Sequence, residues 1–86
     1  MKSRVYSVDG TAVKIVDVEP SNRTVLVRVA GNNIVYLGGA DVTAANGLNT
    51  EKSAVPLEVL VPAGETLWAI ASNGVTETLR VLVQGD

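Results

Sequence analysis

Short valine- and leucine-rich stretches, separated by turn residues about every ten positions, constrain this chain more than any other feature. In the clearest stretch, residues 23–30, Val25, Val27 and Val29 occupy alternate positions and share one side of an extended chain. A period of two is typical of a β-strand with one buried face, and no stretch shows the 3.6-residue period of an amphipathic helix of useful length. The sequence therefore predicts an all-β protein and excludes a parallel α/β sheet.

The turn signals divide the chain into about seven predicted strands. The predicted strands are residues 4–8, 11–18, 23–30, 34–37, 55–61, 66–71 and 75–84. Asp9-Gly10 is a strong tight-turn signal, and Asn73-Gly74 is expected to close a β-hairpin. We expect a small antiparallel β-sandwich or barrel, Greek-key or jelly-roll-like, that forms a single domain over residues 1–86.

Alternation also predicts which side chains face the core. The expected inward residues are Val13, Ile15 and Val18, then Val25, Val27 and Val29, then Val55, Leu57, Val59 and Val61, and finally Leu79, Val81 and Val83. Leu26 lies among polar residues on the opposite side of its strand, which indicates that this side is partly covered too.

Residues 33–43 form a corner around which the other strands are arranged. An apolar strand that contains Tyr36 runs into Gly38-Gly39, which we expect to turn through backbone angles closed to residues with a Cβ. The preceding strands lead up to this corner and the later ones return from it. We interpret Asp41 as capping the turn through its side chain, in preference to contacting a ligand.

The segment after the corner, residues 41–54, is the least regular part of the chain. Its two alanines favour a short helix, but Asn46-Gly47 and Asn49 oppose one. We predict a surface loop with Leu48 tucked against the sheet.

The residue types offer little for catalysis. The chain has no histidine and no cysteine, which removes the commonest general base, the commonest metal ligands and the thiol nucleophile. The carboxylates are interpreted as surface charges in turns or at outward strand positions. They are Asp9, Asp17, Glu19, Asp41, Glu51, Glu58, Glu65 and Glu77. Gly38-Gly39 lacks the following helix and Lys-Ser/Thr of a phosphate loop. We predict no enzyme, no catalytic residue, no metal site and no cofactor.

Charge and length exclude other partners. The net charge is −2 and the basic residues are scattered singly, which argues against nucleic acid. No apolar run approaches the roughly 18 residues needed to span a bilayer, and no apolar core follows the basic start to make a signal peptide. At 86 residues without a disulfide, extra stability must come from a well-packed core or from oligomerisation.

Two of the three aromatic residues raise the possibility of sugar binding. Trp68 and Tyr36 could stack on the apolar faces of sugars if they were exposed. Both lie in strongly apolar strands, so packing in the core or at a subunit interface is the preferred interpretation.

The corner and the strands that return from it resemble a family of small virion proteins of tailed bacteriophages. Residues 35–43 match a V-Y-L-G-G-x-x-V-T corner, residues 55–71 match a P-L … L-x-L-x-P-G-E/D-x-L-[YW]-A-I-A return, and residues 79–83 match a final V-x-V-L strand. The two opening strands, around residues 11–15 and 23–27, are also similar to the family's. Residues 30–32 depart from the family's turn and residues 50–54 are longer, which affects loop contacts more than the fold.

The resemblance implies a non-enzymatic component of a phage particle that is made in the bacterial cytoplasm. The leading expectation is a capsid decoration or cement protein, or a head-fibre domain, on the outside of the virion. Its partners would be the major capsid protein lattice or other virion proteins, and it would self-associate, with a trimer at a symmetry axis as one arrangement. The alternative is a tail or fibre module that recognises a host surface glycan or another virion protein.

Contact residues are expected in the irregular loop and in the N-terminal strand, interpreted as a sheet edge, because partners usually dock at such places. The candidates are Asp41, Thr43, Asn46, Leu48 and Asn49 in the loop, and Lys2, Arg4 and Tyr6 in the strand. Tyr36, Gly38 and Gly39 are assigned a structural role at the corner.

Overall fold

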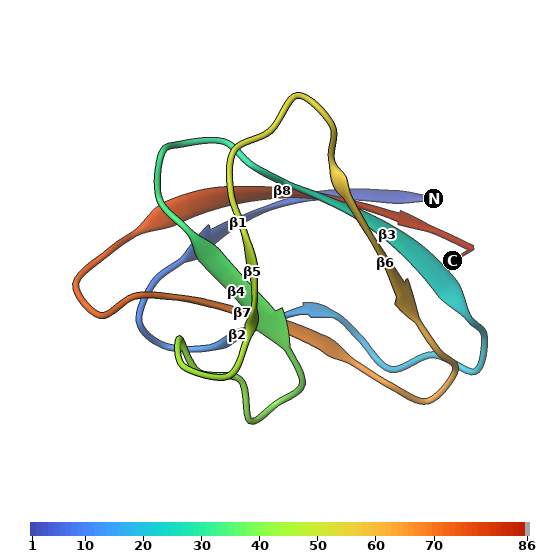
Figure 1. Ribbon diagram of the computed structural model, residues 1–86. Helices are drawn as coiled ribbons and strands as arrows, with labels where there is room; N and C mark the ends of the chain where they lie inside the picture. The colour runs from blue at the N-terminus through green and yellow to red at the C-terminus, as the bar shows by residue number, and fades with distance from the viewer. Residues whose placement is uncertain (86) are drawn as a thin grey trace.

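The computed structural model describes residues 1–85, which form eight β-strands in two antiparallel four-stranded sheets packed face to face (Figure 1). The strands are β1 (Lys2–Val8), β2 (Val13–Val16), β3 (Arg23–Val29), β4 (Val35–Gly38), β5 (Leu48–Thr50), β6 (Leu57–Val61), β7 (Leu67–Ala71) and β8 (Glu77–Gln84). The predicted all-β fold is confirmed. None of the described residues forms a helix long and apolar enough to cross a membrane.

The order of the strands is that of a jelly roll. Sheet A has the order β1-β8-β3-β6 and sheet B the order β2-β7-β4-β5. The antiparallel pairs β1–β8, β2–β7, β3–β6 and β4–β5 are nested, as if one long hairpin had been rolled into a sandwich. Residues 39–47 are the tip of that hairpin (Figure 1). The prediction that strands lead up to this corner and return from it is confirmed.

The Asn73-Gly74 signal marks a real turn, but the hairpin expected there is wrong. Gly74 has a φ of 80°, and the Val75 amide donates to the Ser72 carbonyl at 3.0 Å. However, β7 belongs to sheet B and β8 to sheet A, so this turn crosses between the sheets. A turn dipeptide reverses the chain but does not decide whether the two strands that it joins pair with each other.

The core lies between the two sheets and consists of valine, leucine, isoleucine and alanine. Its buried members are Val8, Ile15, Val16, Val25, Val27, Val29, Val35, Leu37, Val61, Leu67, Ala69, Ala71, Leu79, Val81 and Val83. The inward positions predicted for residues 25–29 and 79–83 are therefore confirmed. Val13, Leu57 and Val59 pack against this core while partly exposed.

Two other predicted inward residues face solvent. Val18 is 55% exposed because the ladder of β2 shifts register between Lys14 and Val16 and the strand then ends. Val55 is 74% exposed because it precedes the start of β6.

The loop predicted over residues 41–54 contains the short edge strand β5, which the sequence did not indicate. Leu48 opens this strand opposite Leu37 and is 59% exposed, so the expectation that it tucks against the sheet is wrong. As an edge strand, β5 has β4 on one side and no strand of residues 1–85 on the other. Such short edges limit unwanted strand pairing.

Candidate binding surfaces

The outer face of sheet A exposes apolar side chains to solvent. Val5 of β1 is 61% exposed and Leu60 of β6 is 64% exposed. Between them, Leu26 of β3 and Leu82 of β8 lie directly opposite each other and are half-buried. We call this surface the sheet A face. It consists of Val5, Leu26, Arg28, Glu58, Leu60, Arg80 and Leu82.

Two arginines lie side by side on the sheet A face. Arg28 of β3 is paired in register with Arg80 of β8, and both side chains are exposed. Among residues 1–85 no carboxylate forms an ion pair with either of them, and Lys52 lines a shared hollow with both. Like charges directly opposite each other in a sheet are destabilising. The local charge is therefore positive, with Glu58 as the one carboxylate on this face and no ion pair between it and either arginine.

A shallow groove of about 420 Å³ joins these arginines to the apolar side chains. Its lining includes Val5, Leu26, Leu82, Pro56, Arg28 and Arg80. Arg4 also lines this groove and was predicted as a contact residue, and Val5 belongs to the N-terminal strand where contacts were expected; Leu26, Leu82, Pro56, Arg28 and Arg80 were not predicted. The signal that could have found them is an apolar residue out of phase with its strand, such as Leu82 between Val81 and Val83.

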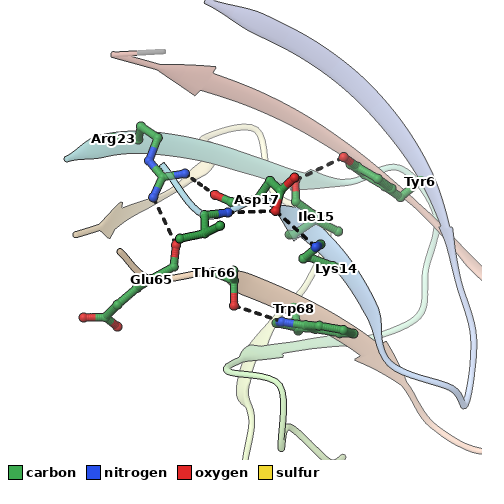
Figure 2. A network of polar contacts seen from close by, with 9 residues as sticks. Tyr6, Lys14, Ile15, Asp17, Arg23, Glu65, Thr66 and Trp68 are labelled. Atoms are coloured by element: carbon green, nitrogen blue, oxygen red, sulfur yellow. Dashed lines mark hydrogen bonds and ion pairs between the residues drawn. The ribbon is translucent and has the colours of Figure 1, made fainter. Parts of the chain in front are cut away.

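The outer face of sheet B carries the aromatic residues. Tyr36 and Trp68 are half-buried, and neither belongs to the core between the sheets. Trp68 lies opposite Gly38 on one neighbouring strand and opposite Lys14 on the other. Its indole Nε1 donates to Thr66 Oγ1 at 3.0 Å (Figure 2). Packing of these rings in the core was thus wrong, because residues 67, 69 and 71 take the inward positions of β7, whereas packing at a subunit interface stays a prediction. We call Lys14, Tyr36, Gly38, Trp68 and Ile70 the sheet B face.

The chain covers part of the sheet B face with its own hairpin tip. Val42 is only 5% exposed and packs where Gly38 and Gly47 leave room. A Cβ at Gly38 would lie 2.9 Å from Val42 Cγ2, and a Cβ at Gly47 would lie 2.6 Å from Tyr36 Cβ. Both glycines therefore permit close approach of the loop to the sheet.

The reason predicted for Gly38-Gly39 is accordingly wrong. Among residues 1–85 the glycines with positive φ are Gly64, Gly74 and Gly85, so neither residue of the pair needs a backbone angle reserved for glycine. Gly38 is required by packing against Val42, and a Cβ at Gly39 would lie 3.3 Å from Asp41 Oδ1. The structural role of the corner is steric.

Thr43 and Asn46 hold the tip together, in place of the Asp41 side chain expected to cap it. The Val42 amide donates to the Gly39 carbonyl at 3.0 Å, and the Thr43 amide donates to Asn46 Oδ1 at 2.7 Å. Asp41 takes part through its backbone carbonyl, which accepts a hydrogen bond from Asn46 Nδ2 at 3.3 Å. Asn46 can bond a backbone donor and a backbone acceptor of the loop, because its side-chain amide both donates and accepts hydrogen bonds.

Arg23 is a buried arginine that donates hydrogen bonds to backbone carbonyls, and Figure 2 shows those to Asp17 and Glu65. It is 1% exposed and donates to the carbonyls of Ser21, Asp17, Pro62 and Glu65. These carbonyls belong to the β2–β3 and β6–β7 connections, so the guanidinium ties two loops at one end of the sandwich. Its position in phase with the inward valines of β3 is the signal for its burial.

Glu77 contradicts the interpretation of the carboxylates as surface charges. It is 5% exposed and accepts hydrogen bonds from the amides of Gly31 at 2.9 Å, Asn33 at 2.9 Å and Thr78 at 2.8 Å. The Asn33 amide is the largest cause of a lowered Glu77 pKa, because donated hydrogen bonds favour the charged carboxylate; burial opposes this shift. Glu77 is in phase with the inward residues of β8, which could have placed it inside.

The predicted contact residues fall into two separate groups. Thr43, Asn46 and their neighbours lie at the hairpin tip and on β5, an edge of sheet B, whereas Lys2, Arg4 and Tyr6 lie on β1, an edge of sheet A. Tyr6 Oη donates to the Ile15 carbonyl at 3.1 Å, so this side chain bridges β1 and β2 (Figure 2). The structure thus does not bring the predicted contacts together, although the edge position predicted for β1 is confirmed.

Exposed apolar side chains, half-buried rings and arginine guanidiniums are groups that bind other molecules. Among residues 1–85, no three acidic, histidine or cysteine side chains gather closely enough to hold a metal ion. Comparison of the chain with protein-family models, with curated proteins and with solved structures finds no match. The function must therefore be inferred from the surfaces themselves and from the motif resemblance.

Proposed function

We propose that this chain is a structural protein of a tailed-bacteriophage virion, and that it decorates the assembled head and stabilises it. The sheet A face carries this proposal, because the completed sandwich leaves Leu60 and the groove residue Val5 open to solvent. Apolar surface of this kind marks protein interaction sites. Jelly rolls are frequent in viral capsids, and they also occur in lectins, so the fold alone does not decide the function.

The physical mechanism is linkage between binding and assembly. A protein that binds the closed shell more tightly than the free subunits shifts the equilibrium towards the closed shell. Many copies on a symmetric lattice stabilise it collectively even when each contact is weak. A small domain with one open apolar face meets this requirement, and self-association at a symmetry axis of the head would add to it.

The test is co-sedimentation with emptied heads of the phage that encodes the protein. We expect a fixed number of copies per head and no binding to unassembled capsid subunits. The double variant Val5→Ser, Leu60→Ser should bind heads at least about tenfold more weakly, because it removes the two most exposed apolar side chains of the sheet A face.

Val18→Ser is the matched control. Val18 is 55% exposed but lies on the β2–β3 connection, away from the sheet A face, so this variant should bind heads as the wild type does. A protein that ignores intact heads, or that binds free subunits equally well, contradicts the proposal.

The second candidate is a tail or fibre module that recognises a host glycan, and the sheet B face favours it. Tyr36 and Trp68 are diagonal neighbours on adjacent strands, with Tyr36 opposite Ile70 and Trp68 opposite Gly38. Half-buried rings on an outer face can stack on sugars while their remaining surface is anchored.

Glycan arrays followed by tryptophan fluorescence titration test this candidate, since Trp68 is the chain's single tryptophan. Affinity that is lost in Trp68→Ala and kept in Ile70→Ala supports it. An array without any hit, or equal losses in both variants, counts against it.

A further inference from the structure

We propose that the sheet A face binds a protein segment that presents a carboxylate between apolar side chains, with Arg28 and Arg80 gripping the carboxylate and Leu26 and Leu82 contacting its neighbours. This inference deepens the proposed function, and rests on it only in taking the sheet A face as the docking surface. It names the chemistry of the partner.

Charge complementarity carries the inference. Arg28 and Arg80 are held opposite each other on neighbouring strands, where their repulsion costs stability, and no carboxylate of residues 1–85 forms an ion pair with either of them. Lys52 adds a third positive charge at the same place. The whole chain has a net charge of −2, so this positive cluster runs against the overall balance. A partner's carboxylate would turn the unfavourable pair into a favourable triad.

The shape of the surface selects a carboxylate on an apolar segment. Guanidinium groups bind carboxylates through paired N–H donors, which gives both energy and orientation. Leu26 and Leu82 are adjacent in the next position along the same strands, and Pro56 borders the same groove. Val5 borders the groove as well, so side chains next to the bound carboxylate would meet apolar surface.

Glu58 marks where an acidic partner would not extend. It faces outward on β6 opposite Leu26, so it lies on the side of the groove away from β1. A second carboxylate of the partner near Glu58 would be repelled. The preferred segment thus carries one central acidic residue with leucine-like neighbours.

The first experiment is an NMR titration of the wild-type protein with the capped peptide acetyl-Leu-Asp-Leu-amide. Acetyl-Leu-Asn-Leu-amide is the matched probe, because it differs only in the charge of its central side chain. We expect a dissociation constant on the order of 1 mM for the acidic peptide and binding at least about tenfold weaker for the neutral one. Shifts should concentrate at the Nε–H groups of Arg28 and Arg80 and at the methyl groups of Leu26 and Leu82.

Variants identify the groups responsible. The double variant Arg28→Gln, Arg80→Gln should weaken binding of the acidic peptide by at least about tenfold and leave the weak binding of the neutral peptide unchanged. Lys14→Gln removes one positive charge from the sheet B face and should change neither value. Glu58→Gln should leave binding unchanged or strengthen it.

Several outcomes would overturn the inference. These are no binding of the acidic peptide up to about 20 mM, equal binding of both peptides, or shifts confined to the sheet B face. A concentration-dependent dimer in sedimentation velocity that Glu58→Gln abolishes would make a second copy the occupant instead. Binding to phosphatidylserine vesicles that the double arginine variant loses, without peptide binding, would point to a lipid surface.

The peptide and head experiments separate this inference from the proposed function. Heads that bind the protein while the acidic peptide does not would leave the proposed function standing without this partner chemistry. The reverse result would leave the carboxylate site standing and remove the capsid as its partner.

Discussion

The two outer faces of this sandwich differ in how the chain treats its own apolar surface. On sheet B, the hairpin tip folds back and Val42 packs down against Gly38 and Gly47, so the chain covers part of the face itself. On sheet A, Val5 and Leu60 stay more than 60% exposed, on a face that also carries two arginines without an ion-pair partner among residues 1–85. The difference separates surface that stabilises the fold from surface available to a partner.

The largest effect is expected from a variant that disrupts the packing of the hairpin tip on the sheet B face. Gly47→Ala should lower the free energy of unfolding by up to about 3 kcal/mol, because the new Cβ would lie 2.6 Å from Tyr36 Cβ and 2.9 Å from Val42 Cγ2. Urea denaturation followed by Trp68 fluorescence measures the loss. Gly39→Ala is the control and should cost less than about 1 kcal/mol, since its Cβ would meet only the Asp41 carboxylate. Equal losses in both variants would mean that the tip does not pack as described.

The next effect compares the two faces directly. Val42→Ala should cost about 2 kcal/mol, because it removes two buried methyl groups and leaves a gap against the sheet. Val5→Ala on the sheet A face should stay within about 0.5 kcal/mol of the wild type, because that side chain is 61% exposed. Thermal denaturation of both variants and the wild type measures the two losses in stability. A loss in Val5→Ala as large as that in Val42→Ala would contradict the distinction between the faces.

A third effect concerns Glu77, whose hydrogen bonds hold the β3–β4 connection between the two sheets. Glu77→Gln should cost about 1 kcal/mol at pH 7, because an amide group replaces an oxygen that accepts backbone hydrogen bonds in the β3–β4 connection.

The pH dependence of this variant follows from the lowered Glu77 pKa. The stabilising contribution is complete above the usual glutamate pKa of 4.5 and is lost as the pH falls through the lower value in the folded state. The wild type and Glu77→Gln should therefore converge in stability as the pH falls below about 4.5. Asp17, whose pKa is also lowered, contributes equally to both proteins. A stability difference that does not change between pH 7 and pH 3 would contradict this role.

The smallest effect sharpens the interpretation of the sheet A face. Arg28→Gln, Arg80→Gln should raise the free energy of unfolding by a few tenths of a kcal/mol, because it removes two like charges held opposite each other. The gain should shrink in high salt, which screens the repulsion. Chemical denaturation at low and high salt measures both. A loss of more than about 1 kcal/mol would show that the guanidiniums stabilise the fold and are not held for a partner.

The sequence predicted the layers of this fold better than its connections. A period of two placed Val25, Val27 and Val29 inside, and the same period, followed one step further, also places Arg23 and Glu77 inside. They were missed because charged side chains are usually exposed, whereas here backbone donors and acceptors satisfy them. Asn73-Gly74 specified a turn but not the crossing between sheets, which depends on pairings with distant strands.

The surfaces were harder to predict than the core. The candidate contacts, chosen from an irregular loop and an edge, stay predictions; the structure adds that Thr43 and Asn46 hold the hairpin tip together and that Tyr6 bridges two strands. Arg28 and Arg80 are far apart in sequence, and only the register of β3 with β8 makes them neighbours. Single-strand patterns cannot supply such a register.

The nested pairing of the strands also governs how the molecule forms. β1 pairs with β8, with Lys2 opposite Val83, so the first strand finds its ladder partner only after the last strand has been synthesised. Every nested pair except β4–β5 joins strands that are separated by a long segment of chain. Proteins dominated by such distant contacts fold in milliseconds to seconds. Among residues 1–85, β4 and β5, which flank the hairpin tip, are the only two strands consecutive in the sequence that pair with each other, so they can pair early. Folding of this chain should thus begin at the tip and finish where its two ends meet.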